Sequence, residues 1–395
     1  MFILTNCKIY TVTNGIIENG SIFVKHGKID KIGTIDSFPD GIPVYDLKGK
    51  SVTPGFIDAH CHVGIFNEGT GDIGADGNDM SSPTTPFLKA VDGIYPDDEA
   101  FDDALENGVT TMCIGPGSGN VIGGQMAVVK PISNIIEEMV LTDYVGLKCA
   151  FGENPKRVYG SRNIMPTTRM GVAGILRKTL SEAKNYLLKK EFSENKPAEE
   201  GKPKEPFYPE FEKEVLIPVL KKEKPLRCHA HRMDDIQTAI RIAEEFDVDI
   251  VIEHCTEGYK IADFLATKGT KCIIGPLNGT KPKVELKDST LKAPMILEKA
   301  GVDFAVMTDA PVERIGSLFD DVRLFVRHGL TEKTALESVT INPAKILGYD
   351  EEFGSIETGK VADLNIFSGD PFDFRSKVET VIINGKVEFG DLENE

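Results

Sequence analysis

The sequence predicts an α/β protein with two parts, a (β/α)8 barrel and a small β-sandwich that both chain ends build together. Three observations predict this fold class. Short apolar strands alternate with helical stretches through the middle of the chain, the two ends contain short strands with tight turns, and 395 residues suffice for a barrel and a modest second domain. We place the sandwich at 1–53 and 350–395 and the barrel at 54–349.

The middle of the chain contains eight candidate strands. Several are near-continuous apolar runs, as expected for strands buried on both faces of a parallel barrel. The clearest helix is 232–246, where apolar residues recur at helical spacing from Ile236 behind an acidic first turn. Eight such units over about 250 residues match the size of a (β/α)8 barrel. The expected strands, all taken as parallel, are 52–62, 108–115, 126–130, 146–152, 226–230, 249–255, 271–277 and 303–310.

One segment, 181–224, interrupts this alternation between the fourth and fifth strands. It contains ten lysines, ten glutamates and five prolines, with few apolar residues. We expect it to be an insertion on the catalytic side of the barrel. A solvated helical excursion is the favoured interpretation, and a lid over the active site is the alternative, because loops of this length often have a function.

Composition and charge exclude several function classes. The formal charge of −17 argues against a nucleic-acid partner, whose binding needs a basic surface. There is no apolar run long enough for a membrane span and no signal-peptide pattern at the N-terminus, so we expect a cytoplasmic protein with no membrane partner. The seven cysteines lack CxxC spacing and are expected to be reduced core residues.

Polar residues fall at the carboxyl ends of several expected strands, where barrel enzymes place their chemistry. His60 and His62 end the first strand, and their spacing puts both side chains on one strand face. His229 ends the fifth strand, His254 the sixth and Asp309 the eighth. Imidazole and carboxylate groups gathered at one end of a barrel predict a metal site.

These motifs resemble the amidohydrolase superfamily over nearly the whole chain. The signature PGFIDxHxH stands at 54–62, HAH at 229–231, EH at 253–254 and TDAP at 308–311. The tail, NPAKILG at 342–348 followed by GSIETGKVADL at 354–364, resembles the closing helix of that superfamily and its return to the sandwich. Within the superfamily the sequence is most similar to the imidazolonepropionase-like and Xaa-Pro-dipeptidase-like branch.

The resemblance implies a metal site and leaves one ligand open. It implies that His60, His62, His254 and Asp309 are ligands and that His229, rather than His231, completes the fifth-strand position. The fourth strand, GLKCAFGE at 146–153, resembles that of isoaspartyl dipeptidase, in which a carbamylated lysine bridges two metals. Lys148 takes that place here and is favoured. Glu153, at the strand end, is the alternative carboxylate ligand, and a structural ion pair of Lys148 is a third interpretation.

Other residues near these positions are candidates for positioning or binding the substrate. His231 and Glu253 adjoin the ligands and are expected to orient imidazole rings, with His231 also a candidate catalytic residue. Arg162 and Arg169 are candidates for gripping a substrate carboxylate, with solvated charges as the alternative. The glycine-rich run 117–125 lacks the features of a phosphate cradle, and we expect it to line the pocket and present Gln125.

The resemblance implies a hydrolase that attacks a C–N bond of an amide, cyclic amide or dipeptide-like substrate with a metal-bound hydroxide, while Asp309 transfers the proton. The alternatives are a deaminase of the same superfamily, which usually has an acidic proton shuttle shortly after the fifth-strand histidine, and a non-catalytic scaffold. The expected cofactor is one or two divalent ions, with zinc favoured over manganese or iron. The partner is a small-molecule substrate, and a homo-oligomer is compatible with the sequence.

Overall fold

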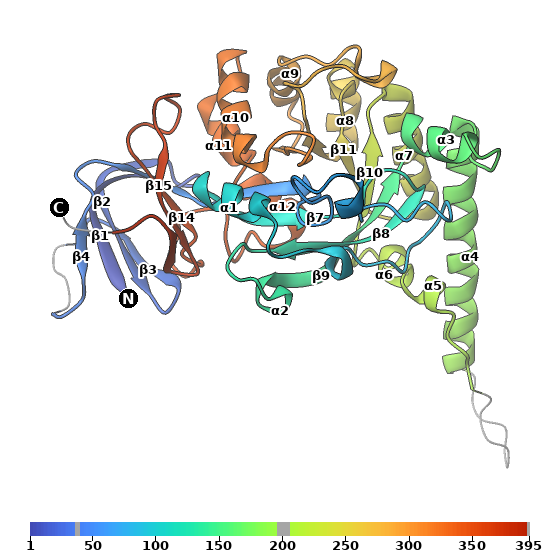
Figure 1. Ribbon diagram of the computed structural model, residues 1–395, viewed down its shortest axis with the longest axis horizontal. Coiled ribbons are helices and arrows are strands. Elements are labelled where there is room, and N and C mark those ends of the chain that lie inside the picture. The colour runs from blue at the N-terminus through green and yellow to red at the C-terminus, as the bar shows by residue number, and fades with distance from the viewer. Residues whose placement is uncertain (36–39, 196–205, 393–395) are drawn as a thin grey trace.

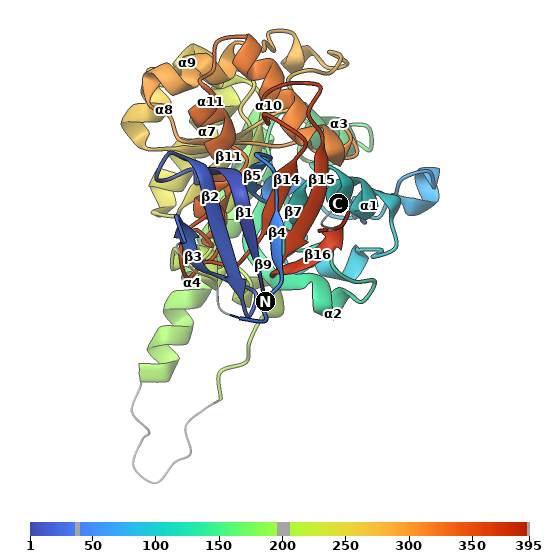
Figure 2. The same ribbon diagram turned by 90° about the vertical axis from the view of Figure 1, so that its left-hand side faces the viewer.

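The computed structural model describes residues 1–35, 40–195 and 206–392, which form a β-rich part and a barrel (Figure 1). The β-rich part is one sheet with the strand order β16-β15-β14-β5-β1-β2-β3, and β4 pairs with β1 beside it. Figure 2 shows this sheet facing the viewer. Its strands are β1 (Phe2–Tyr10), β2 (Ile16–Lys25), β3 (Lys28–Gly33), β4 (Val44–Asp46), β5 (Ser51–Pro54), β14 (Leu364–Phe367), β15 (Val378–Ile383) and β16 (Lys386–Phe389).

Both chain ends contribute to this sheet because β14 pairs antiparallel with β5, Leu364 opposite Pro54. The apolar side chains of the two ends pack into one cluster that includes Ile9, Val52 and Ile366. β5 leads directly into the first barrel strand, so this sheet fixes the position from which the barrel begins.

The barrel contains eight strands in chain order, and the expected α/β fold class is confirmed. The backbone N–H of His62 donates to the carbonyl of Ala310 at 2.8 Å, which joins the ends of the first and last barrel strands. The strands are β6 (Phe56–Cys61), β7 (Val109–Ile114), β8 (Ile122–Val129), β9 (Val140–Ala150), β10 (Leu226–Ala230), β11 (Ile250–His254), β12 (Lys271–Ile274) and β13 (Phe304–Val306).

One barrel strand differs from expectation. β8 runs antiparallel to both β7 and β9, whereas all eight strands were expected to be parallel. The reason is the short connection 115–121 between β7 and β8. A parallel crossover needs a dozen residues or more, so a connection of this length can only return the chain as an antiparallel neighbour.

Helices cover the outside of the barrel (Figure 1). The expected helix at 232–246 is α7, which buries Ile236, Ala239, Ile240 and Ala243 on one face. The helices are α1 (Glu99–Glu106), α2 (Ile136–Met139), α3 (Glu153–Gly160), α4 (Arg169–Asn195), α5 (Phe211–Glu214), α6 (Ile217–Leu220), α7 (Met233–Phe246), α8 (Ala262–Lys268), α9 (Ala293–Ala300), α10 (Leu318–Arg327), α11 (Glu332–Glu337) and α12 (Ile341–Leu347).

The insertion lies at the opposite end of the barrel from the one we expected. Helix α4 begins where Arg169 Nε contacts Asp235 Oδ2 at 3.0 Å, near the carboxyl end of β10, and then runs back along the barrel. Tyr144, in the first half of β9, donates its hydroxyl to the carbonyl of Val215 at 3.0 Å. The described part of 181–224 therefore lies toward the amino ends of the strands and covers no strand carboxyl end, while 196–205 lies outside the described residues.

No helix of the described residues is long and apolar enough to cross a membrane. All seven cysteines are buried and free of disulfides. Six of them lie in the barrel strands or directly after one, where they are small apolar core residues.

Candidate metal and active site

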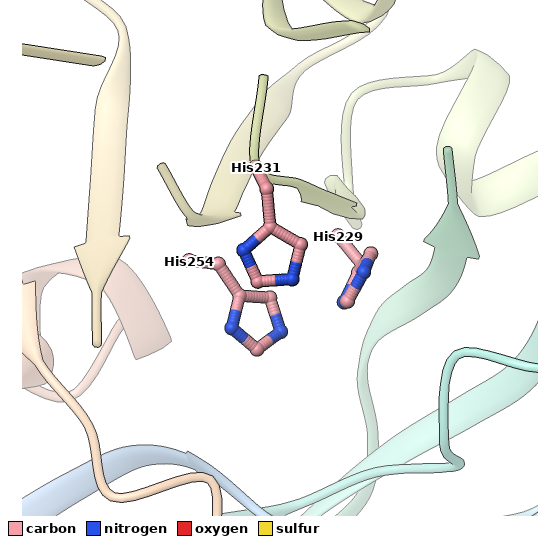
Figure 3. A group of neighbouring side chains, drawn as sticks. All are labelled: His229, His231 and His254. Carbon is pink, nitrogen blue, oxygen red and sulfur yellow. The ribbon is translucent and has the colours of Figure 1, made fainter. Parts of the chain in front are cut away.

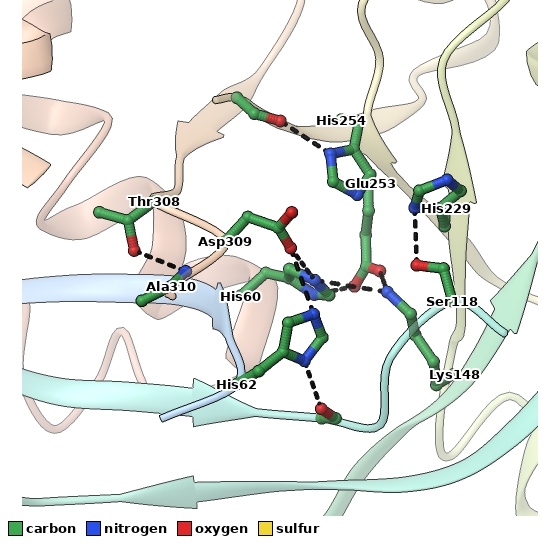
Figure 4. Close-up of polar contacts among 12 residues, drawn as sticks. His60, His62, Ser118, Lys148, His229, Glu253, His254, Thr308, Asp309 and Ala310 are labelled. Carbon is green, nitrogen blue, oxygen red and sulfur yellow. Dashed lines mark hydrogen bonds and ion pairs between the residues drawn. The ribbon is translucent and has the colours of Figure 1, made fainter. Parts of the chain in front are cut away.

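The carboxyl ends of four barrel strands bring the predicted ligands together (Figure 4). His60 and His62 come from the end of β6, His229 from β10 and His254 from β11, while Asp309 follows β13. Each of these residues is at most 8% exposed, so the ligand atoms face one another rather than bulk solvent.

Two of these residues have a strained backbone. His254 has φ +67° and Asp309 has φ +55°, in the left-handed region that residues with a Cβ rarely adopt. Both stand where a strand ends, and in Figure 4 both side chains point toward His60 and His62. Such a conformation costs about 1–3 kcal/mol and persists mainly at functional sites. The strain therefore marks these two strand ends as parts of a site.

His60, His62 and Asp309 form the Asp309 cluster. Oδ1 of Asp309 lies 3.2 Å from Nε2 of His60 and 3.2 Å from Nε2 of His62. Nδ1 of His62 lies 2.6 Å from the carbonyl of Gly115, which can only accept, so Nδ1 carries the proton and Nε2 of the neutral ring carries a lone pair. Lys148 Nζ, which can only donate, lies 3.4 Å from Nε2 of His60 and indicates a lone pair there too.

In the Asp309 cluster the carboxylate oxygen therefore faces the lone pairs of two imidazoles, and His254 also lies close enough to share an ion with His60 and Asp309. Asp309 Oδ1 is buried with no hydrogen-bond partner among the described residues. Two imidazole nitrogens and a carboxylate oxygen in this arrangement repel unless a cation lies between them. This donor set fits a divalent metal ion such as zinc, manganese or iron.

His229, His231 and His254 form the three-histidine cluster (Figure 3). Their ring centroids are 4.2–4.6 Å apart. Each Nδ1 has a partner: Ser118 Oγ at 2.8 Å for His229, Thr256 Oγ1 at 2.8 Å for His231 and the Gly275 carbonyl at 2.9 Å for His254. Each Nε2 is buried and lacks a hydrogen-bond partner within the described chain.

The electrostatics favour neutral imidazoles at His62, His229, His231 and His254 and an ionised carboxylate at Asp309. Burial lowers the pKa of His254 to about 3 and holds the pKa values of His229 and His231 well below the ordinary value. Burial also lowers the pKa of His62, although the contact with Asp309 opposes it. Burial acts to raise the pKa of Asp309, but the neighbouring histidines outweigh it and hold that pKa well below its usual range. These are the protonation states that metal ligands require.

Beneath the Asp309 cluster lies a buried charged network centred on Glu253. Its Oε1 lies 3.0 Å from His60 Nδ1 and accepts from Arg227 Nε at 2.9 Å, while Oε2 pairs with Lys148 Nζ. Arg227 also donates to the carbonyl of Ala59 at 2.6 Å, so it ties β10 to β6. Burial is the largest influence on the pKa of His60 and acts to lower it, but the charge of Glu253 and the contacts with Asp309 and Glu253 together outweigh it, so the pKa is raised. Glu253 thus contacts a candidate ligand ring, as the sequence suggested.

The structure places the two fourth-strand candidates differently. Lys148 is fully buried, with Nζ between Glu253 and His60 at the centre of the site. Glu153 is the first residue of α3, and its backbone N–H donates to Glu285 Oε2 at 3.0 Å. Among the described residues, the groups close enough to share an ion do not include the Glu153 carboxylate.

The three candidate substrate-binding residues make their hydrogen bonds and ion pairs to groups other than the histidines. Gln125 is buried in β8, and its amide donates to the carbonyl of Pro86 at 3.4 Å. Arg162 is exposed and donates to the carbonyl of Met80 at 2.6 Å. Arg169 pairs with Asp235, and its Nη2 is buried with no hydrogen-bond partner in the described chain.

Several residues that shape the site were not singled out from the sequence. Ser118 and Thr256 hold histidine rings through hydroxyl groups, and Asp58 links the ends of β6 and β13 through Thr308. The sequence could have identified Asp58 as a site residue, because it stands two residues before His60 and so shares its strand face. No sequence pattern could have identified Ser118, since it is 111 residues away from its partner His229.

Two large cavities are among those that lie outside the histidine clusters. One of about 770 Å³ lies beside the glycine-rich loop and is lined by residues that include Asn78, Pro116 and Gly123. The other, about 860 Å³, lies at the amino ends of the strands, where Lys224 and Ile250 line it. The first is large enough for a small-molecule substrate and lies near the loop that carries Ser118.

Comparison with known proteins establishes the family. Residues 51–387 match the model of the amidohydrolase family and residues 1–52 match the NagA composite domain, so this chain belongs to the amidohydrolase family. It is therefore an enzyme of the class that hydrolyses carbon–nitrogen bonds, and the superfamily expected from its motifs is confirmed.

Individual relatives agree with this assignment. The chain is 27% identical to the amidohydrolase tasK of Hapsidospora irregularis over 94% of its own length, but spans only 40% of that protein. It is 25% identical to imidazolonepropionase of Pseudomonas fluorescens, covering 91% of this chain and 90% of the relative. The crystal structure of an amidohydrolase from Thermotoga maritima is 45% identical, with a TM-score of 0.94, over 99% of this chain and 100% of that one.

Proposed function

We propose that this chain is a metal-dependent hydrolase that cleaves a C–N bond in an amide, a cyclic amide or a dipeptide-like substrate. The observation that carries the proposal is the Asp309 cluster, in which Asp309 Oδ1 lies 3.2 Å from Nε2 of His60 and 3.2 Å from Nε2 of His62. His60, His62 and Asp309 would hold one ion, and His229 and His254 would complete the metal site. A bound divalent ion lowers the pKa of water toward about 7 and polarises the scissile carbonyl.

The protein's own residues supply proton transfer and orientation. Asp309 is ionised at neutral pH and its side chain is 12% exposed, so it can accept the proton of the attacking water and pass it to the leaving nitrogen. His231 has a buried Nε2 without a hydrogen-bond partner in the described chain and is the second candidate for proton transfer. Ser118 and Gly275 fix the rings of His229 and His254, so the site needs little reorganisation.

The carboxylates after the fifth strand support hydrolysis over deamination. A deaminase would need one of them as a proton shuttle near the histidines. Here Asp234 accepts from Arg232 at 2.9 Å, and Asp235 accepts from Arg169 at 3.0 Å. Both carboxylates are thus engaged by arginines.

The experiment combines metal analysis with a substrate screen. Protein purified without chelator should contain a divalent metal by plasma emission and should hydrolyse members of a panel of N-acyl amino acids, dipeptides and cyclic amides. His60→Ala should lose metal and activity. Asp309→Asn should keep most of its metal but lose about 10²–10⁴ in kcat, as expected for a positioned acid–base group. His26→Asn, at an exposed turn, is the matched control.

Two results would contradict the proposal. If His60→Ala keeps its full metal content, the proposal that His60 is a metal ligand is contradicted. An Asp309→Asn variant that keeps its metal and more than about a tenth of the wild-type kcat would assign proton transfer to another residue, with His231 tested next.

A further inference from the structure

The carboxylate of Glu285 has one oxygen without a hydrogen bond. Glu285 lies in the short 3-10 helix Val284–Leu286, between β12 and α9, and its side chain is fully buried. Its Oε1 has no hydrogen-bond partner among the described residues. Buried polar atoms in native proteins are nearly always paired, because burial removes the water that would otherwise solvate them. This oxygen is thus free to accept a hydrogen bond from a bound molecule.

The other oxygen fixes the carboxylate in place. Oε2 accepts from the backbone N–H of Glu153, the first residue of α3, at 3.0 Å. The residue before α3 is Gly152, which has no side chain to cap the helix, and a Cβ there would lie 2.6 Å from Oε2. Glu285 therefore caps α3 from a distant loop, where the positive end of the helix favours a carboxylate. This contact holds Oε1 in one direction.

Oε1 faces the three-histidine cluster. It lies 3.7 Å from Nε2 of His231, whose ring stands beside the rings of His229 and His254 (Figure 3). In the proposed function His229 and His254 belong to the metal site, where the bound ion polarises the scissile carbonyl. The amide nitrogen is bonded directly to that carbonyl carbon. Oε1 is therefore one imidazole ring away from the place where the proposed function puts the scissile bond.

The charges around Oε1 select the chemical class of the donor. Lys283 Nζ lies 3.6 Å from Oε1, within the range of an ion pair but too far for a hydrogen bond. A cationic substrate group at Oε1 would be repelled by this ammonium, and an anionic group would be repelled by the carboxylate itself. A neutral N–H or O–H group meets neither repulsion and supplies the hydrogen bond. In an amide, the neutral donor nearest to the scissile carbonyl is the amide N–H.

We propose that Glu285 is a specificity-determining residue that accepts a hydrogen bond from the N–H of the scissile amide. The enzyme then prefers secondary and cyclic amides that have this N–H over amides whose nitrogen is fully substituted, such as an Xaa-Pro dipeptide. A site built to hydrogen-bond a substrate N–H rejects the analogue that lacks it, because the buried acceptor is left unpaired. The proposal rests on the proposed function, which supplies the position of the scissile carbonyl.

Substrate pairs that differ only at the scissile nitrogen test the proposal. The metal-loaded full chain is assayed with Ala-Ala and Ala-N-methylalanine, N-acetylalanine and N-acetyl-N-methylalanine, and hydantoin and 3-methylhydantoin. Wild type should prefer the N–H member of each pair that it cleaves by more than about 10-fold in kcat/KM. N-methylation also adds bulk, so the variants below separate the hydrogen bond from the steric effect.

Glu285→Gln should reduce this preference to less than about threefold. Its amide oxygen can still accept from the N–H of Glu153, which turns the NH2 group toward the substrate N–H and places donor against donor. The kcat/KM of the N–H member should fall, while that of the N-methyl member should stay nearly unchanged. Asp288→Asn is the matched control, because this carboxylate in the same loop pairs with Lys260 at 2.5 Å. It should keep the wild-type preference.

The other outcomes contradict the proposal. Equal kcat/KM for both members in wild type would overturn it and leave the proposed function standing. An equal fall for both members in Glu285→Gln would do the same, since that is the effect of a residue that only caps α3. A wild type that cleaves no member of any pair would overturn both proposals. If circular dichroism shows that Glu285→Gln is unfolded, Glu285→Asp replaces it. This variant withdraws the oxygens by one methylene and must also reduce the preference.

Discussion

Asp58 shows how a residue that binds no ion can set the geometry of the site. Its Oδ1 accepts from the backbone N–H of His60 at 3.0 Å, and its Oδ2 accepts from the backbone N–H and the hydroxyl of Thr308 at 3.1 and 2.6 Å. β6 and β13 are not paired in the barrel ladder, so this carboxylate and the backbone hydrogen bond from His62 to Ala310 link their ends. Asp58 fixes the separation of His60 from Asp309, the residue after Thr308.

We predict that Asp58→Asn weakens metal binding more than Thr308→Val does. An amide cannot accept at both ends, so one of the backbone N–H groups that Asp58 satisfies would face an N–H donor in the Asn variant. The expected loss in zinc affinity is about 10–100-fold, measured by competition with a chromogenic chelator. Thr308→Val removes the hydroxyl bond and leaves the backbone bond, so its effect should be smaller. The reverse order would show that Asp58 does not set the ligand spacing.

Residue type and strand position were enough to predict that the candidate histidine ligands and Asp309 would lie close together. The reason is that parallel strands that end together bring their last side chains together. The same reasoning predicted that Glu253 would contact a ligand ring, since it adjoins His254. It could not find Ser118 or Thr256. Serine and threonine are common in loops, and only the folded distances show which hydroxyl meets which imidazole.

At the scale of elements, β8 shows where the periodicity of a sequence is insufficient. An apolar strand has the same appearance whether it runs parallel or antiparallel, so the pattern at 126–130 predicted a strand without fixing its direction. The length of the preceding connection carried that information. The insertion was misplaced for a related reason: charge and proline content do not show at which end of α4 the chain leaves the barrel.

Helix α10 allows a prediction about pH. Burial raises the pKa of Asp321 to about 9, and a hydrogen bond with Glu313 and its charge act in the same direction. Because the folded-state pKa lies above the ordinary value of 3.8, the folded protein holds a proton that the unfolded chain releases. The contribution of Asp321 to stability is therefore present at acid pH and is lost as the pH rises from about 4 to about 9.

We predict that Asp321→Asn raises the thermal midpoint at pH 8.5 and changes it much less at pH 5. The amide keeps a donor toward Glu313 and cannot ionise. Asp102→Asn, which changes an exposed carboxylate on α1, is the control and should not show this pH-dependent gain. Equal shifts at both pH values would show that Asp321 ionises normally.

At the scale of the whole molecule, Lys130 connects the barrel to the sheet built from the chain ends. It follows β8, is 2% exposed, and its Nζ lies 2.5 Å from Asp363 Oδ2 and 2.8 Å from Asn384 Oδ1. The ammonium also lies 5.3 Å from the ring centroid of Phe353. The buried ammonium of Lys130 thus contacts one residue just before β14 and one just after β15.

We predict that Lys130→Met destabilises the protein by about 3–5 kcal/mol, because it leaves the buried Asp363 carboxylate without its partner. Denaturant unfolding measures this loss. Metal content of the folded variant should be unchanged, since Lys130 is no part of the site. Adding Asp363→Asn should recover some of the lost stability. A double variant that is less stable than Lys130→Met would mean that the charge of Asp363 is compensated elsewhere.

The place of β14 between β5 and β15 also affects the order in which the chain can fold during synthesis. β5 is translated early, but the strand that covers its edge begins at Leu364. At about 5–20 residues per second, ribosomes need on the order of tens of seconds to make the intervening chain. Throughout that time the nascent protein exposes an unpaired strand edge, which is a template for aggregation. Polypeptides that terminate within the barrel never acquire the covering strand, so they should be recognised by chaperones and proteases even when the barrel itself has formed.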